Sequence, residues 1–383
     1  MEKGQIREKA ICRRGFLKRA ALAGAAFCVA PAFGKATAAK KAVMGRPATA
    51  STGMAAMATL HGFRTLGSGN AAFRVSTMGF GCMGLNHHRS QHPDEKTCIR
   101  LVHEAIERGV RLFDTAESYG YHANEILTGK ALKGYADRVF ATTKFGHKFV
   151  NGVHVRTEED STPANIRRVC ENSLRNLGVE TLGIFYQHRI DPGTPIEVVA
   201  ETVGELIKEG KVLHFGLCEV NAETIRRAHA VCPVTAIQSE YHFMHRTVEQ
   251  NGVLALCEEL GIGFVPYSPL NRGFLGGMIN EYTQFDPTND NRQTLPRFQP
   301  EAIRQNMRIV EVLNAFGRTR GITPAQVALA WLLNKKPFIV PIPGTTKLSH
   351  LEENLRASDI RFAAETVKEL EDAVAAIPVT PTP

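Results

Sequence analysis

The order of apolar and polar residues divides most of the chain into alternating short and long segments. From Ser76 onward, short apolar runs are each followed by a longer stretch in which apolar residues recur every three or four positions. Runs of the first kind are typical of buried parallel strands, and stretches of the second kind are typical of helices that bury one face. The alternation therefore predicts an α/β fold.

Eight strand–helix units can be counted in this pattern. Strands are expected at residues 78–83, 110–114, 139–144, 182–188, 212–217, 234–238, 263–267 and 338–341. Helices are expected at residues 94–108, 123–133, 163–177, 195–209, 222–230, 248–260, 301–318, 324–333 and 348–355. Eight such units predict a (β/α)8 TIM barrel.

Three further segments are expected around the barrel. A β-hairpin is predicted at residues 64–75, with Gly67-Ser-Gly-Asn70 at its turn, and it would close the bottom of the barrel. An extra helix is predicted near the C-terminus, at residues 365–376. The loop at residues 271–300 is long enough to indicate a functional role rather than a simple connection.

The first 38 residues have the pattern of an export signal. Cys12-Arg-Arg-Gly-Phe-Leu-Lys18 resembles the twin-arginine motif, a weakly apolar run follows at residues 20–33, and Ala36-Thr-Ala38 is a small-x-small cleavage pattern. We therefore predict a signal peptide at 1–38, a flexible linker at 39–62 and the barrel domain at 63–383, with export to the periplasm by the twin-arginine machinery. The alternative is a cytoplasmic protein with a basic tail.

The basic charge of the chain belongs to this leader. The formal net charge is +8, and residues 1–41 hold ten Lys and Arg against two acidic residues, so the remainder sums to about zero. No basic patch therefore indicates nucleic-acid binding by the barrel.

The apolar run of the leader is too short and too rich in Gly and Ala for stable membrane insertion. The eight cysteines show no metal-ligand spacing, so buried free thiols and no metal site are expected.

Ionisable residues follow three successive predicted strands. Asp114 ends the second strand, and Tyr119 comes five residues later. Lys144 ends the third strand and His188 ends the fourth. Because the carboxyl ends of the strands of a barrel meet at one face, these four side chains are expected to converge there.

The four side chains are suited to carbonyl reduction. Tyr119 can protonate the growing alkoxide, but a free phenol titrates near about 10 and is too weak an acid at neutral pH. An adjacent Lys144 ammonium is expected to lower the pKa of the phenol, and Asp114 is expected to keep the lysine charged. His188 can donate a hydrogen bond to the substrate oxygen.

Several motifs resemble the aldo-keto reductase superfamily, and the resemblance runs from about Phe63 to Ile377. They are Asp114-Thr-Ala-Glu-Ser-Tyr-Gly120, Ala141-Thr-Thr-Lys-Phe-Gly146, Tyr186-Gln-His-Arg189, Val265-Pro-Tyr-Ser-Pro-Leu270 and Ile342-Pro-Gly-Thr-Thr-Lys347. Gly273-Phe-Leu-Gly-Gly277 and Pro296-Arg-Phe298 look most like the bacterial and plant branch that acts on aldehydes, pyridoxal among them. The resemblance implies NADP(H)-dependent reduction of aldehydes and ketones to alcohols, with the same four catalytic residues.

The resemblance also implies a nicotinamide-binding site at the ends of the later strands. The ring of Tyr267 is expected to stack on nicotinamide, and the amide of Gln238 suits its carboxamide. Most relatives have Ser followed by Asn or Glu where this chain has Cys218 and Glu219. Cys218 is then either a weaker donor to the carboxamide or a small filler beneath the ring. The other cofactor residues implied on this side are Ser268 and Leu270.

A second part of the implied cofactor site precedes the helix expected at 348–355. Backbone N–H groups at a helix start favour an anion, so Gly344, Thr345 and Thr346 suit a phosphate. Lys347 is expected to pair with a 2′-phosphate, which would favour NADP(H) over NAD(H). His350 stands where many relatives have Arg, and Glu353 and Asn354 match the pair on the adenine side.

Two readings other than a reductase are open at this stage. Channel β-subunits of the same superfamily bind nucleotide mainly to sense or regulate, so a binding subunit with little turnover is the alternative function. A glycoside-cleaving barrel would need two catalytic carboxylates, and the lysine and tyrosine argue against it. A small aldehyde or ketone remains the expected substrate, and the sequence does not indicate an oligomeric state.

Overall fold

The computed structural model describes residues 62–89 and 91–379. The predicted signal peptide (1–38) and all but the last residue of the predicted linker (39–62) lie outside these ranges, so both stay predictions. Within the described residues, no helix is long and apolar enough to cross a membrane.

The centre of the barrel domain is a sheet of seven parallel strands, in the order β11-β10-β9-β8-β5-β4-β3. The strands are β3 (Phe80–Gly81), β4 (Leu112–Asp114), β5 (Phe140–Phe145), β8 (Leu182–Gln187), β9 (Val212–Cys218), β10 (Val234–Glu240) and β11 (Gly263–Tyr267). Each overlaps a strand predicted from the apolar runs. The predicted strand positions were therefore confirmed for these seven.

The expected eighth strand, at residues 338–341, closes the barrel without forming a regular ladder. On one side Val340 N donates to Phe264 O at 2.8 Å, and on the other Gly79 N donates to Pro341 O at 3.0 Å. Gly81 N donates in the same way to Pro343 O at 3.3 Å. Since the prolines have no N–H to donate in return, only the isolated bridge Phe264–Ile339 is regular. The segment still joins β11 to β3, which gives the (β/α)8 barrel.

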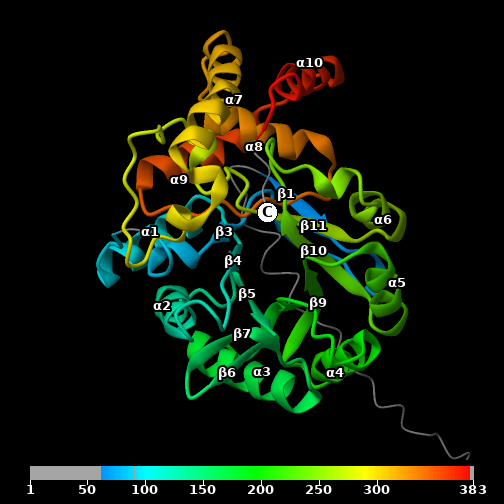
Figure 1. The fold of residues 1–383 in the computed structure, drawn as a ribbon. Helices are drawn as coiled ribbons and strands as arrows, with labels where there is room; N and C mark the ends of the chain where they lie inside the picture. Colours follow the sequence, from blue (N-terminus) through cyan, green and yellow to red (C-terminus); the bar gives the residue numbers. More distant parts are fainter. Residues whose placement is uncertain (1–61, 90, 380–383) are drawn as a thin grey trace, which may run out of the picture. The chain divides into compact units, whose positions relative to one another are not determined.

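Helices surround this sheet in a ring (Figure 1). The ring contains α1 (Glu95–Glu107), α2 (Ala123–Leu132), α3 (Pro163–Leu177), α4 (Ile196–Lys208), α5 (Ala222–Val231), α6 (Val253–Leu260), α8 (Pro324–Lys335) and α9 (Leu348–Arg356), while α7 (Pro300–Arg318) and the C-terminal α10 (Ala364–Ala375) lie outside α8. Most bounds differ from the predicted ones by one or two residues. The exception is α6, predicted from Val248, because Gly252 adopts a left-handed conformation and delays the helix to Val253.

The predicted N-terminal hairpin is present and closes the bottom of the barrel. It consists of β1 (Phe63–Leu66) and β2 (Phe73–Ser76), paired antiparallel. Leu66 and Phe73 are buried with apolar residues of the barrel interior, and the Phe73 ring lies 4.6 Å from the ring of Phe140, where β5 begins. A Cβ on Gly263, the first residue of β11, would lie 2.4 Å from the Leu66 side chain. The strand therefore needs glycine there to let the hairpin approach.

A second hairpin was not predicted. Strands β6 (His147–Val150) and β7 (Val153–Glu159) pair antiparallel after β5, at the C-terminal face of the barrel. No strand was predicted for this segment from the sequence. Asn151 and Gly152 form its turn with positive φ values of 51° and 78°, and Asn-Gly between alternating residues is a strong hairpin signal. That signal could have identified the hairpin from the sequence.

Candidate active site

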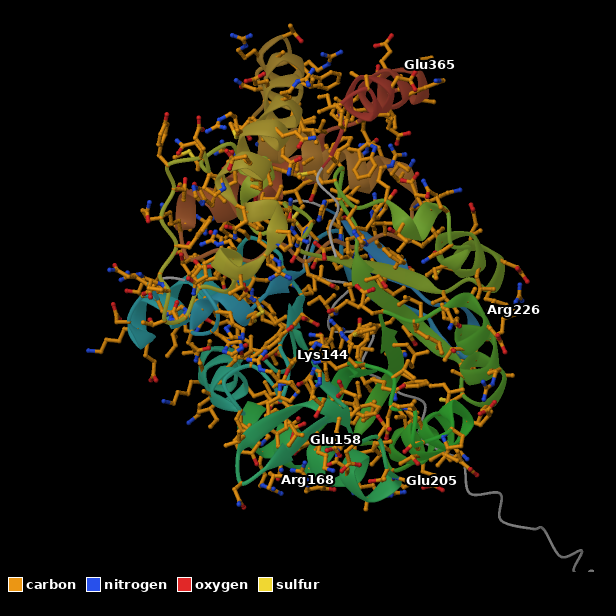
Figure 2. All side chains as sticks on the ribbon, in the orientation of Figure 1. Lys144, Glu158, Arg168, Glu205, Arg226 and Glu365 are labelled. Atoms are coloured by element: carbon orange, nitrogen blue, oxygen red, sulfur yellow. The ribbon has the colours of Figure 1, made fainter. Side chains whose placement is uncertain are left out.

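Four side chains converge at the C-terminal face of the barrel, as the sequence predicted. Asp114 is the last residue of β4, Lys144 lies near the end of β5, and His188 follows β8 directly. Tyr119 comes from the turn between β4 and α2. Figure 2 shows Lys144 inside the ring of elements, whereas the labelled Arg226 and Glu205 lie at its outer edge.

A buried ion pair forms the base of this site. The Nζ atom of Lys144 donates to Asp114 Oδ1 at 2.6 Å and to the Thr115 carbonyl at 2.7 Å. The other carboxylate oxygen of Asp114 accepts from Thr142 Oγ1 and Gln238 Nε2, both at 3.0 Å. Burial is the largest single influence and lowers the pKa of Lys144, but the charge and hydrogen bond of Asp114, together with Tyr119 and Cys218, outweigh it and raise the pKa above its ordinary value. The lysine is therefore an ammonium at any physiological pH.

Tyr119 is the side chain next to this ammonium. Its hydroxyl lies 3.5 Å from Lys144 Nζ. Burial raises the pKa of Tyr119, and although Lys144 lowers it, the net pKa stays above the ordinary value of a phenol. Lys144 therefore acts in the expected direction, but desolvation of the phenolate exceeds the attraction of this one ammonium. Tyr119 is fully protonated at neutral pH.

His188 lies on the other side of Tyr119 as a neutral imidazole. The two rings meet edge to face, with centroids 6.0 Å apart. Burial, with the nearby charges of His147 and Lys144, holds the pKa of His188 well below its ordinary value. Ser118 Oγ lies 3.4 Å from His188 Nδ1 and can donate to it. In that tautomer the Nε2 atom carries the proton and is a hydrogen-bond donor.

This arrangement can deliver a proton to a carbonyl oxygen. A protonated phenol and a neutral imidazole donor lie side by side, and an ammonium directly behind the phenol can stabilise the phenolate once the proton has left. The carboxylate of Asp114 is saturated by three side-chain donors and is not available as a base.

The residues expected around a nicotinamide lie at the ends of β9, β10 and β11. The Tyr267 ring is half-buried, and its hydroxyl is hydrogen-bonded to Glu219. Glu219 also accepts from Glu240 N at 2.8 Å. Cys218 is buried in the barrel interior, and burial raises the pKa of its thiol to about 12, so the thiol stays neutral. The Gln238 amide lies beside them and donates to Asp114.

The residues expected around phosphate groups lie at the start of α9. Lys347 precedes this helix, no described side chain caps its N-terminus, and Lys347 is exposed. Thr345 Oγ1 accepts from Lys347 N at 3.1 Å, which folds the turn in front of the helix. A Cβ on Gly344 would lie 2.5 Å from Gly81 O, so glycine is needed for this turn to approach β3.

These two regions fit a dinucleotide. A half-buried aromatic ring lies at the end of β11, and an uncapped helix N-terminus that favours an anion lies beyond the closing segment. Ser268 and Leu270 lie in the loop that follows β11, where Asn271 N donates to Ser268 O at 2.7 Å. His350 and Glu353 are half-buried on α9, and Asn354 is buried there.

Glu117, in the same loop as Tyr119, should make stability depend on pH. Its side chain is buried, its Oε2 atom has no hydrogen-bond partner in the described residues, and burial raises its pKa from 4.5 to about 7. The folded protein therefore keeps a proton that the unfolded chain releases, and stability should fall as pH rises through that window. Glu117→Gln should remove this part of the slope in urea unfolding measured at about pH 5 and about pH 8. An unchanged slope would contradict the assignment.

The residues that support the four central side chains were not predicted from the sequence. Thr142 and Gln238 hold Asp114, and Ser118 lies against His188. Gln238 had been assigned to the cofactor, and nothing in its local sequence links it to Asp114, which lies on a strand distant in the chain. The order of the strands in the closed barrel is what brings these partners together.

Comparisons with known proteins agree with this geometry. Residues 77–375 match the model of the aldo/keto reductase family. A probable aldo-keto reductase from Glycine max is 42% identical over 310 residues, which span 80% of this chain and 87% of the relative. The structure of a glycerol dehydrogenase from Gluconobacter oxydans matches with a TM-score of 0.74 and 26% identity, over 83% of this chain and 98% of that one.

A thermostable aldo-keto reductase solved with the inhibitor epalrestat shares the fold, with a TM-score of 0.64 and 24% identity over 81% of this chain and 99% of that one. The family match covers most of the chain, including all four central residues. The chain is therefore a member of the aldo/keto reductase family and an oxidoreductase of carbonyl compounds.

Proposed function

We propose that the protein reduces aldehydes and ketones to alcohols with NADP(H), and that Tyr119 is the general acid. The observation that carries the proposal is the contact of the Tyr119 hydroxyl with a buried ammonium, 3.5 Å from Lys144 Nζ, next to the neutral imidazole of His188. A phenol with a cation on one side and a hydrogen-bond donor on the other is suited to protonating a carbonyl oxygen.

Each of the four central side chains has a separate role in this reaction. A bound nicotinamide supplies the hydride. His188 donates a hydrogen bond that orients the carbonyl oxygen, and Tyr119 transfers its hydroxyl proton to that oxygen as negative charge develops. Lys144 stabilises the phenolate that remains, and Asp114 fixes the ammonium in place. Since the pKa of Tyr119 lies above its ordinary value, this charge stabilisation is needed after the proton leaves.

The proposal is tested with the purified full chain. NADPH and a panel of neutral and charged aldehydes should give loss of NADPH and formation of the corresponding alcohol. Tight NADPH binding without alcohol formation from any aldehyde would overturn the proposal and support a nucleotide-binding subunit instead.

Lys347→Ala should weaken NADPH binding by about 1–3 kcal/mol, the range for a lost charge-assisted hydrogen bond. Lys347 is exposed at the uncapped start of α9, so its ammonium is available for the 2′-phosphate, which NADH lacks. Binding of NADH should change little. Titration of both nucleotides by fluorescence checks this, with Lys368→Ala, an exposed lysine of α10, as the control. Equal losses for NADPH and NADH would remove Lys347 from the 2′-phosphate site.

A further inference from the structure

Two arginines converge on one neutral oxygen beside the active site. Arg89 lies in the segment between β3 and α1, and Arg272 lies in the long loop after β11. Arg89 Nη1 donates to Asn291 Oδ1 at 2.8 Å, and Arg272 Nη1 donates to the same atom at 3.2 Å. Two guanidinium groups from distant parts of the chain therefore share a single amide acceptor. We call them the arginine pair.

No carboxylate of the described residues forms a direct ion pair with the arginine pair. Among the described residues, neither Arg89 nor Arg272 has a carboxylate oxygen within ion-pair distance. The acidic groups nearby are engaged by other cations. Asp290 Oδ2 pairs with Arg292 at 2.6 Å, and Glu240 Oε1 pairs with Arg297 at 2.8 Å. Asp290 acts on Arg89 and Glu240 interacts with Arg272 through charge, but these two carboxylates are shared among four guanidinium groups, so positive charge remains in excess.

Burial makes this arrangement costly without a further partner. The Nε atom of Arg272 is buried and has no hydrogen-bond partner in the part of the chain that the structure describes. Burial, with the charges of Arg272 and Arg292, lowers the pKa of Arg89 to about 9, although the Asp290 charge opposes part of this shift. An anion stabilises two like charges that are held close together and partly desolvated, especially where one N–H donor has no hydrogen-bond partner.

The arginine pair lies next to the proposed proton donor. His87, two residues before Arg89, stacks on Tyr119 with ring centroids 5.7 Å apart. Burial lowers the pKa of His87, and the positive charges of Arg89 and of Arg156 on β7 lower it further. Arg156 is exposed, and no ion pair is found for it in the described ranges. One side of the entrance to Tyr119 is therefore cationic.

We propose that the arginine pair binds a carboxylate or phosphate group carried by the carbonyl substrate. The anionic oxygens accept from Arg89 and Arg272 while the carbonyl end of the same molecule reaches Tyr119. This inference rests on the proposed reductase function and adds the substrate class to it. A phosphate of the nucleotide has the same chemistry, so the test must separate an anion on the substrate from one on the cofactor.

The test uses matched aldehydes and matched variants of the full chain. The substrates are 4-formylbenzoate and its neutral methyl ester, each with NADPH. The variants are Arg89→Met, Arg89→Lys, and the control Arg100→Met, an exposed arginine on α1. Wild type and the control should prefer the anionic aldehyde in kcat/KM, and Arg89→Met should lower that preference by about tenfold to 100-fold. Arg89→Lys should retain part of it, and KM for NADPH should stay within the control range.

Each contrary result has a distinct meaning. An equal fall for both aldehydes together with a raised KM for NADPH would assign Arg89 to the nucleotide and overturn the inference. Reduction of both aldehydes without any anionic preference in wild type would overturn it as well, while leaving the reductase function intact. If no aldehyde is reduced, the reductase proposal fails separately. Calorimetric titration with 4-formylbenzoate then still decides the anion site, since equal binding by Arg89→Met and Arg100→Met would exclude it.

Discussion

Tyr119→Phe is expected to lower kcat for aldehyde reduction by about 10²- to 10⁴-fold, the contribution of a general acid. The substitution removes only the hydroxyl, which lies 3.5 Å from Lys144 Nζ, and leaves the ring that His87 and His188 contact. NADPH binding should therefore stay within about twofold of wild type, because the expected cofactor contacts come from other strands. Single-turnover kinetics and nucleotide titration measure the two quantities separately.

The control for this variant is Tyr135→Phe. Tyr135 follows α2 and lies under the guanidinium of Arg138, outside the active site. Both variants lose one phenolic hydroxyl, so a loss of kcat confined to Tyr119→Phe is specific to the site. A Tyr119→Phe protein that keeps nearly wild-type kcat would show that another group protonates the substrate.

Lys144→Met is expected to lower both turnover and stability. Without the ammonium, the phenolate of Tyr119 loses its stabilising charge, and reduction should become undetectable or nearly so. The Asp114 side chain would lose its cationic partner in the barrel interior and keep only Thr142 and Gln238 as side-chain donors. Breaking a buried pair by removing one partner costs about 3–5 kcal/mol. Urea unfolding measures the loss of stability, and NADPH consumption with an aldehyde measures the loss of turnover.

The double variant Lys144→Met, Asp114→Asn separates the two effects. A neutral amide can still accept from Gln238 and Thr142, so most of the lost stability should return. Activity should remain absent, because no positive charge lies behind Tyr119. Recovery of activity together with stability would mean that Lys144 serves only to neutralise Asp114.

The arrangement of the barrel could be predicted because its pattern is local. Each buried parallel strand is a run of apolar residues, and each covering helix has one apolar face, so both can be identified without knowing their partners. The positions of Asp114 and Lys144 followed from the same rule, since residues at strand ends of a barrel meet at one face. The irregular contact of the closing segment with β3 could not be predicted in the same way. Pro341 and Pro343 accept hydrogen bonds from β3 and the residue before it but have no N–H to donate, and the pattern of apolar residues does not show this.

The balance of charges at the site required the tertiary structure. The sequence predicted that Lys144 lowers the pKa of Tyr119, which is the direction of that one interaction. It could not give the opposing desolvation, because burial depends on everything packed around the ring. The same holds for Glu117, an unremarkable acidic residue of the motif until its carboxyl is found buried without a partner for one oxygen.

The sequence by itself determined the barrel, the family resemblance and the four central side chains, because strand periodicity and short motifs are properties of neighbouring residues. Only the tertiary structure decided which groups from distant parts of the chain bind the same atom or lie close enough to interact through charge. Arg89 and Arg272 are far apart in the chain and have no common motif, yet they meet on Asn291. Electrostatic interactions depend on distance and desolvation in three dimensions, and neither can be obtained from spacing along the chain.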